Sequence, residues 1–202
     1  MKNYLLHLLC LLCIFTISHL ALAQDEKKEY EEKIDESEIP ETIKELLSPM
    51  MEDARRIKYF REYDENHSGY EIEMVWEGKK LSIEFYDDGR LMDIEELISH
   101  KEIEDEAREA IDEYMDDTYK RHRMLRIQRQ YTAEEEDDED EDEEIIEDFM
   151  EGDTDDLTIR YEIVAQVKGE EKYGPYEFLF DDEGNTLKVQ RIDRRSSDNV
   201  LY

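Results

Sequence analysis

Strict alternation of apolar and charged side chains is the feature that most constrains the fold of this chain. One strand face would carry Tyr70, Ile72, Met74 and Trp76, and the other would carry Glu71, Glu73 and Glu77. Residues 81–85, 161–167 and 176–180 show the same pattern. A period of two with one polar face is typical of an antiparallel sheet that buries only one side. These segments therefore predict strands of such a sheet.

Two other segments carry apolar residues at helical spacing. The first contains Ile39, Ile43, Leu46, Leu47 and Met50, and the second contains Ile103, Ala107, Ala110, Ile111 and Tyr114. This spacing predicts one amphipathic helix before each group of strands. Gly89 and Gly184 end two acidic tripeptides at points where the chain must reverse, and glycine readily adopts the positive φ that tight turns need.

The elements recur in order along the chain. Tyr70–Ile72 recurs as Tyr161–Ile163, and Phe85–Gly89 recurs as Phe180–Gly184, with an offset that increases from the helices to the last strands. Internal repetition predicts repeated structural units. We therefore expect an α+β fold of two tandem repeats, each a helix packed on an antiparallel sheet of three to four strands. The expected boundaries are an acidic disordered linker at 24–38, repeats at 39–97 and 98–193, an acidic insertion at 133–156 and a tail at 194–202.

The first 23 residues have the pattern of a secretory signal. Lys2 precedes a Leu-rich apolar run, and Ala21-Leu22-Ala23 forms a cleavage site of the A-x-A type. We expect cleavage after Ala23 and a periplasmic or extracellular protein with no membrane span, although a retained membrane anchor is the alternative. Both cysteines, Cys10 and Cys13, lie in this segment, so the mature protein would have neither disulfides nor thiolate chemistry.

Charge narrows the classes of partner. The chain carries a formal charge of −33, and the signal contributes one positive residue and no acidic one. Such a charge repels nucleic acid and anionic lipid, and it attracts cations and basic surfaces. We therefore expect no nucleic-acid partner. The expected partner is another envelope or extracellular protein. The negative charge of this chain favours a partner with a basic surface.

Several motifs together resemble the PepSY-like family of exported bacterial proteins, also described as beta-lactamase-inhibitor-like. The first copy matches at Ile39–Glu41, Tyr70–Ile72 and Glu84–Gly89, and the second at Tyr161–Ile163 and Phe180–Gly184. The second copy lacks the proline and carries the acidic insertion. The resemblance implies a tandem helix-on-sheet architecture, an exported location and a protein-binding, inhibitor-like role. A named target would rest on fold analogy alone.

The acidic run Glu134–Glu144 consists of eleven consecutive carboxylates. One interpretation is a disordered, self-repelling loop. The other is a loose cation trap or a tether for a basic partner, with Glu134, Glu135, Glu136, Asp137 and Asp138 as candidate binding residues. A specific calcium site needs ligands at defined spacing with a glycine for the turn, which this run lacks. We therefore assign no metal ligand.

Aromatic residues on the predicted strands have two interpretations. Most would form the core beneath a helix, whereas Phe60 and Tyr86 would lie on the open sheet face and could contact a partner. No histidine of the mature chain has metal-ligand spacing, and no nucleophile or phosphate-loop motif occurs there. The sequence thus predicts a non-enzymatic, exported protein-binding module, inhibitor-like in role and without a cofactor. The alternative is a calcium- or cation-binding envelope protein that acts through residues 134–156.

Overall fold

The computed structural model describes residues 26–27, 30–63, 68–133, 141–169 and 172–192. Ten strands form one sheet: β1 (Glu26–Lys27), β2 (Tyr30–Ile34), β3 (Arg55–Tyr63), β4 (Ser68–Trp76), β5 (Lys79–Tyr86), β6 (Leu91–Leu97), β7 (Arg121–Ala133), β8 (Leu157–Lys168), β9 (Tyr173–Asp181) and β10 (Thr186–Ile192). The spatial order is β1-β10-β9-β8-β7-β6-β5-β4-β3-β2. From β2 to β10 every pair is antiparallel and consecutive in the chain, whereas β1 pairs with β10 in parallel.

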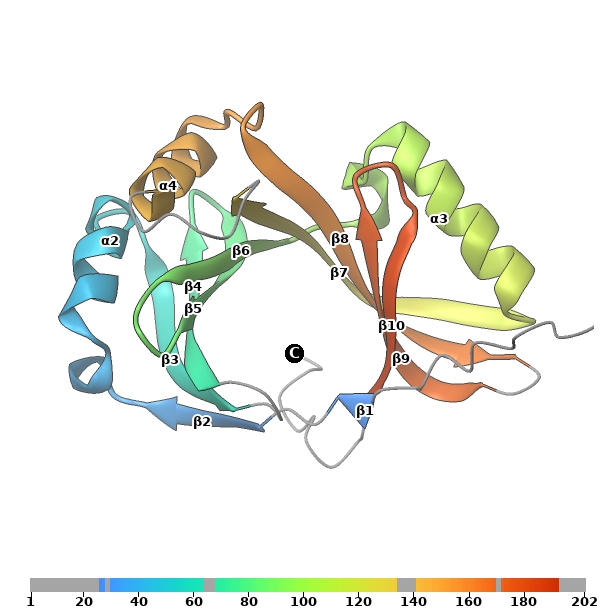
Figure 1. Ribbon diagram of the computed structural model, residues 1–202, viewed down its shortest axis with the longest axis horizontal. Helices are drawn as coiled ribbons and strands as arrows, with labels where there is room; N and C mark the ends of the chain where they lie inside the picture. The colour runs from blue at the N-terminus through green and yellow to red at the C-terminus, as the bar shows by residue number, and fades with distance from the viewer. Residues whose placement is uncertain (1–25, 28–29, 64–67, 134–140, 170–171, 193–202) are drawn as a thin grey trace, which may run out of the picture.

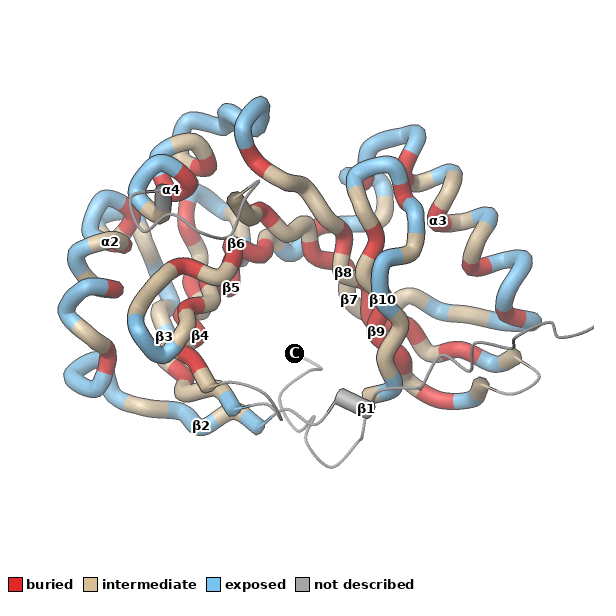
Figure 2. Tube along the Cα trace, viewed as in Figure 1, coloured by how far each residue is buried: buried red, intermediate tan, exposed pale blue. Residues whose placement is uncertain are grey.

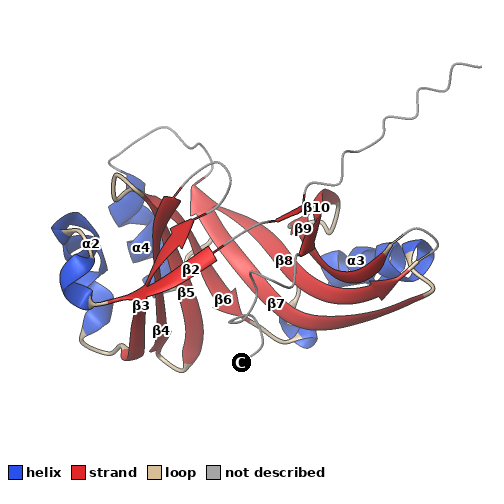
Figure 3. Cartoon of the chain, turned by 90° about the horizontal axis from the view of Figure 1, so that it is seen from below, coloured by secondary structure: helices blue, strands red, loops and turns tan. Residues whose placement is uncertain are grey.

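The sheet is strongly curved, and the α-helices all lie on its convex side (Figures 1 and 3). They are α2 (Glu41–Met51), α3 (Asp105–Thr118) and α4 (Glu141–Glu151), with short 3-10 helices η1 (Glu36–Glu38) and η2 (His100–Glu102) before α2 and α3. The opposite side of the sheet, which we call the concave face, is not covered by any described helix (Figure 1).

Two apolar clusters combine buried residues of the helices with buried residues of the strands. Figure 2 shows the buried parts of these elements in red. The first includes Ile43, Leu47 and Met50 of α2, Ile72, Ile83, Phe85 and Ile94 of the strands, and Ile145, Ile146 and Phe149 of α4. The second includes Ala107, Ile111 and Met115 of α3, and Ile127, Tyr161, Ile163, Phe178 and Phe180 of the strands. The helical and strand periodicities seen in the sequence place these residues on one side of each element.

The predicted fold class is wrong. The chain is mostly sheet and forms a single continuous sheet, not two tandem helix-on-sheet repeats, because β6 pairs with β7 from Ile94–Tyr131 to Leu97–Gln128. Two separate sheets would each leave an unpaired strand edge at this point, and pairing β6 with β7 satisfies both edges. Tyr131 of β7 also packs in the first core, so that core extends beyond Leu97. The boundaries of the expected repeats, 39–97 and 98–193, stay predictions.

The linker expected to be disordered and the acidic insertion, for which disorder was one interpretation, both contain regular structure. Within 24–38, β2 pairs with β3 from Tyr30–Tyr63 to Ile34–Tyr59, and η1 follows it. Within 133–156, α4 buries Ile145, Ile146 and Phe149 against the first core. An acidic segment buries little apolar surface, so composition alone suggests that the loss of conformational entropy would keep it disordered. Backbone pairing in the first segment and apolar burial in the second offset that cost.

No described helix is both long enough and apolar enough to cross a membrane. The expected signal, residues 1–23, and the expected tail, residues 194–202, lie outside the described residues. Signal cleavage after Ala23 therefore stays a prediction.

Candidate functional site

Strand register places a series of carboxylates on the concave face. Residues directly opposite each other in an antiparallel pair project from the same face of the sheet. Glu71 lies opposite Phe60 on one side and Glu84 on the other, and Glu84 lies opposite Asp93. Because Ile72, next to Glu71, projects into the first core on the convex side, Glu71 and its opposite neighbours project from the concave side.

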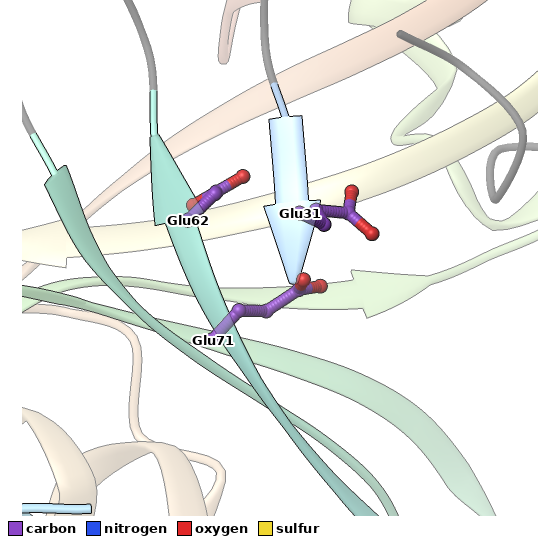
Figure 4. Close-up of side chains that lie close together, drawn as sticks. All are labelled: Glu31, Glu62 and Glu71. Atoms are coloured by element: carbon purple, nitrogen blue, oxygen red, sulfur yellow. The ribbon is translucent and has the colours of Figure 1, made fainter. Parts of the chain in front are cut away.

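Three of these carboxylates meet near the β2 edge of the sheet, and we call them the edge trio. Glu31, Glu62 and Glu71 come from β2, β3 and β4, and one carboxylate oxygen of each lies within 4.8 Å of the other two (Figure 4). Glu31 lies directly opposite Glu62. Three separate chain segments therefore bring like charges together at this edge.

Glu84, Asp93 and Glu95 form a second group, which we call the central trio. They come from β5 and β6, and one carboxylate oxygen of each also lies within 4.8 Å of the others. Asp93 and Glu95 are each only 5% exposed. Carboxylates this deeply buried need polar partners, because an isolated buried charge is costly.

Hydroxyl and amide donors from neighbouring strands support the two trios. The Ser82 hydroxyl donates to Glu71, the amide of Gln128 donates to Glu95, and Gln130 Nε2 donates to Asp93 Oδ2 at 2.9 Å. Such bonds stabilise a carboxylate but do not cancel its charge. The central strands thus hold a continuous acidic band across the concave face.

A guanidinium lies at the far end of this band. Arg126 Nη2 donates to Glu162 Oε1 at 3.0 Å, and the Arg126 side chain is 31% exposed. Burial disfavours the charged guanidinium, but the carboxylates of Glu162, Glu95 and Glu177 outweigh it and raise the pKa of Arg126 above its usual value. Arg126 therefore carries a permanent positive charge beside carboxylates of the concave face.

A cavity of about 410 Å³ opens beside Arg126. It is lined by Arg56, Lys58, Glu71, Glu73, Met74, Val75, Lys80, Leu81, Ser82, Leu97, Arg126 and Gln128. Glu73 lies opposite Ser82, and the next pair on the same face is Val75 opposite Lys80. The concave face thus has an acidic region around the two trios and a region rich in basic residues at one end of the same strands.

The predicted partner-binding aromatics both project from this concave face. Phe60 lies opposite Glu71, and Tyr86 lies opposite Gly69, which precedes Glu71 by two residues. Phe60 is only 7% exposed, with Lys58 Nζ at 6.0 Å from its ring centroid, whereas Tyr86 is half-buried and carries the Arg90 guanidinium 5.1 Å from its ring. Tyr86 therefore offers a partner more surface than Phe60 does, and a role for either in binding stays a prediction.

The other predicted residues, Glu134, Glu135, Glu136, Asp137 and Asp138, lie outside the described residues. Sequence reasoning did not single out the central trio. Its signal was present, because the polar positions of alternating strands must point to the open face. What the local pattern could not show is which strands become neighbours, and that pairing decides which carboxylates meet.

Comparisons with known proteins give little further guidance. No family model matches the sequence, and no curated protein matches it. A BLIP-like protein from Bacteroides fragilis is 12% identical, with 75% of this chain and 84% of that chain covered at a TM-score of 0.45. A protein from Bacteroides thetaiotaomicron, described as calcium-regulated and periplasmic, is 13% identical, with 80% and 97% covered at a TM-score of 0.29. At these values neither likeness supports an argument about function, and the PepSY-like resemblance stays a prediction.

Proposed function

We propose that this chain is an exported, non-enzymatic binding protein that engages a basic surface of another envelope or extracellular protein. The acidic region of the concave face would make the contact. The observation that carries the proposal is the placement of carboxylates directly opposite one another, Glu31 with Glu62 and Glu84 with both Glu71 and Asp93.

Like charges at directly opposite positions of a sheet destabilise it. Three such pairs lie on the face that no described helix covers, and the repulsion within each pair reduces the stability of the sheet. Lysine or arginine side chains from a partner would relieve that repulsion and gain charge-assisted hydrogen bonds. Charge complementarity of this kind also accelerates association and favours basic partners over acidic ones.

The described histidines support binding over catalysis. His100 Nε2 lies 2.9 Å from Asp112 Oδ1 of α3, and His122 Nδ1 lies 3.8 Å from Asp116 Oδ1 in the last turn of that helix. Both contacts are on the convex side, away from the trios. Neither imidazole therefore stands where it could exchange protons with a group bound on the concave face.

The test is capture of partners from an envelope extract by the immobilised mature protein. A variant with Glu31→Gln, Glu62→Gln and Glu84→Gln should lose a basic partner that the wild type retains. The matched control carries Glu106→Gln, Glu109→Gln and Glu113→Gln, the same charge change on exposed positions of α3. Equal retention by both variants, or recovery only of abundant basic proteins that elute with salt, would contradict the proposal.

Divalent-cation binding is the second candidate, and one observation favours it. The carboxylate oxygens of each trio lie within 4.8 Å of one another, which allows one calcium ion to contact all three at its usual oxygen distances of about 2.3–2.6 Å. The cation site of this candidate lies at the two trios of the concave face, whereas the sequence pattern predicted it in residues 134–156. Calcium would supply the positive charge that the first candidate takes from a protein.

Calcium titration separates the two candidates. If a trio binds calcium, millimolar calcium chloride should raise the melting temperature of the wild type and of the α3 control by mass action, but not that of the concave-face variant. If calcium has no effect while the basic partner is still captured, the protein-binding proposal stands alone. Deleting residues 134–140 should leave either response unchanged.

The exported location is part of the proposal. Its support is the signal pattern at residues 1–23. Expression in a bacterium with an envelope should yield a mature protein that begins at Gln24, as N-terminal sequencing would show. Recovery of the intact chain in the membrane fraction would favour the retained anchor instead.

A further inference from the structure

The cavity on the concave face is basic although the chain as a whole is strongly acidic. Four cationic side chains line it, Arg56, Lys58, Lys80 and Arg126, against two carboxylates, Glu71 and Glu73. These come from β3, β4, β5 and β7, so the cations converge from separate strands. A local excess of positive charge in a protein of net charge −33 calls for a physical explanation.

The carboxylates of the lining already have donors within it. Glu73 pairs with Lys58, and Glu71 accepts the Ser82 hydroxyl. By contrast, the side chains of Arg56 and Lys80 form no ion pair or hydrogen bond with any residue in the part of the chain that the structure describes. Arg126 bonds Glu162 through Nη2, and its buried Nε has no acceptor among the described residues. Positive charge and donors are therefore left for a ligand.

Backbone irregularities lie at both walls of the cavity. In β3 the register shifts between Arg55 and Lys58, and Arg56 has φ of 58°, a left-handed conformation that costs a residue with a side chain about 1–2 kcal/mol. In β7 the register shifts between Met124 and Arg126. Bulges redirect side chains and are frequent beside binding sites. Here they deliver Arg56 and Arg126 to the same cavity.

Part of the lining is apolar. Leu97 is 41% exposed at the end of β6, and Val75 of β4 is half-buried in the same lining. The volume of about 410 Å³ falls in the range of pockets that hold small ligands, which is about 300–1,000 Å³. A ligand that fills this cavity would need an anionic group for the cations and an apolar part for Leu97 and Val75.

We infer that this cavity binds a carboxylate carried on a short apolar body. The carboxylate would lie between Arg126, Lys80 and Arg56, since planar guanidinium groups bind carboxylates through paired hydrogen bonds. The net negative charge of the chain does not forbid this, because charges further than about 8 Å are largely screened at physiological salt. Of the nearer carboxylates, Glu73 is paired with Lys58, Glu162 with Arg126, and Glu71 accepts the Ser82 hydroxyl. Two sources share this chemistry: the carboxyl terminus of a peptide and a free small acid.

The test uses matched pairs of probes that differ only in charge. The small-acid pair is 4-methylpentanoate and 4-methylpentanamide, and the peptide pair is acetyl-Ala-Leu with a free and with an amidated carboxyl terminus. Calorimetry and protein-observed NMR should show at least one acid binding about tenfold or more tightly than its amide. The acid that binds more tightly identifies the source.

Variants locate the binding in the cavity. Arg126→Gln should weaken binding of the acid by about tenfold or more, but it also leaves Glu162 without its guanidinium and could impair folding. The double variant Arg56→Asn and Lys80→Gln avoids this difficulty, because neither side chain has a described partner and asparagine tolerates the left-handed backbone. It should show a loss of similar size. The control Lys101→Gln removes one charge from exposed η2 on the other side of the sheet and should change nothing.

Equal binding of acid and amide, no binding at millimolar probe, or an equal loss in the Lys101→Gln control would each overturn the inference. These outcomes leave the proposed function untouched. The residues changed to test that function, Glu31, Glu62 and Glu84, do not line the cavity.

Discussion

At the scale of single residues, Asp87 shows how a turn on this sheet is held. Its carboxylate, just after β5, accepts hydrogen bonds from the Ser68 hydroxyl at the start of β4 and from Arg61 of β3. These bonds tie the turn to both strands. The bond from Ser68 above all, and then the bond and charge of Arg61, lower the pKa of Asp87 below its usual 3.8. The ionised form is therefore favoured by folding.

This depressed pKa predicts a pH-dependent contribution to stability. It is present above about pH 4, where Asp87 is ionised in both states, and is lost as pH falls through the folded-state pKa. Because the side chain is 54% exposed, Asp87→Asn should lower the free energy of unfolding at neutral pH by less than about 1 kcal/mol. Urea unfolding at neutral pH and at about pH 3 should show the difference from wild type shrinking. Asp53→Asn, at an exposed position after α2, is the control, and a difference that persists unchanged in acid would contradict the assignment.

At the scale of elements, the reverse turn at Gly184 packs directly against helix α3, whereas the turn at Gly78 does not. Gly184 has φ of 85°, and a Cβ there would lie 2.6 Å from the Ala107 carbonyl oxygen of α3. Gly78 has φ of 90°, but a Cβ there would meet nothing within 4 Å. Gly78→Ala should therefore cost about 1–2 kcal/mol from backbone conformation alone. Gly184→Ala should cost clearly more, because the turn and α3 must separate. Chemical denaturation measures both, and equal costs would show that the turn does not press on the helix.

Helix α4 is the element whose role the acidic composition concealed. Phe149 is 2% exposed, its ring centroid lies 5.0 Å from that of Tyr131 and 6.0 Å from that of Trp76, and Asp142 accepts the Leu91 amide at 2.9 Å. Phe149→Ala should therefore lower the free energy of unfolding by about 3–5 kcal/mol, as for other large core side chains. Glu147→Ala, an exposed position two residues earlier, should cost little. If both variants melt together with the wild type, α4 does not belong to the core.

The sequence predicted elements better than it predicted their assembly. Helical spacing of Ile43, Leu47 and Met50 and the alternation around Ile72 correspond to α2 and β4, and the positive φ expected at Gly89 and Gly184 is confirmed. These are local properties of the backbone and of side-chain periodicity. The pairing of Leu97 with Gln128 joins segments far apart in the sequence, and no local pattern specifies it. The same limit applies to Glu84, Asp93 and Glu95, whose meeting depends on strand order.

At the scale of the whole molecule, one continuous sheet should unfold as one cooperative unit. The two cores share the β6–β7 junction, and Tyr131 and Ile159 connect the strands there to the first core. A small single domain usually unfolds in one transition that every probe reports alike. Trp76 is the sole tryptophan of the chain and is buried in the first core, so its fluorescence reports that core alone. Far-ultraviolet circular dichroism reports strands on both sides of the junction.

These two probes should therefore give coincident thermal transitions. Met115 of α3 is fully buried in the second core, and Met115→Ala should remove about 2–5 kcal/mol there. If the sheet transmits this loss, the Trp76 transition should move down with the circular dichroism transition, although Trp76 belongs to the other core. The two cores unfold separately if the Trp76 transition stays at its wild-type temperature while part of the dichroism signal is lost at a lower temperature. That outcome would make the β6–β7 pairing too weak to couple the two cores.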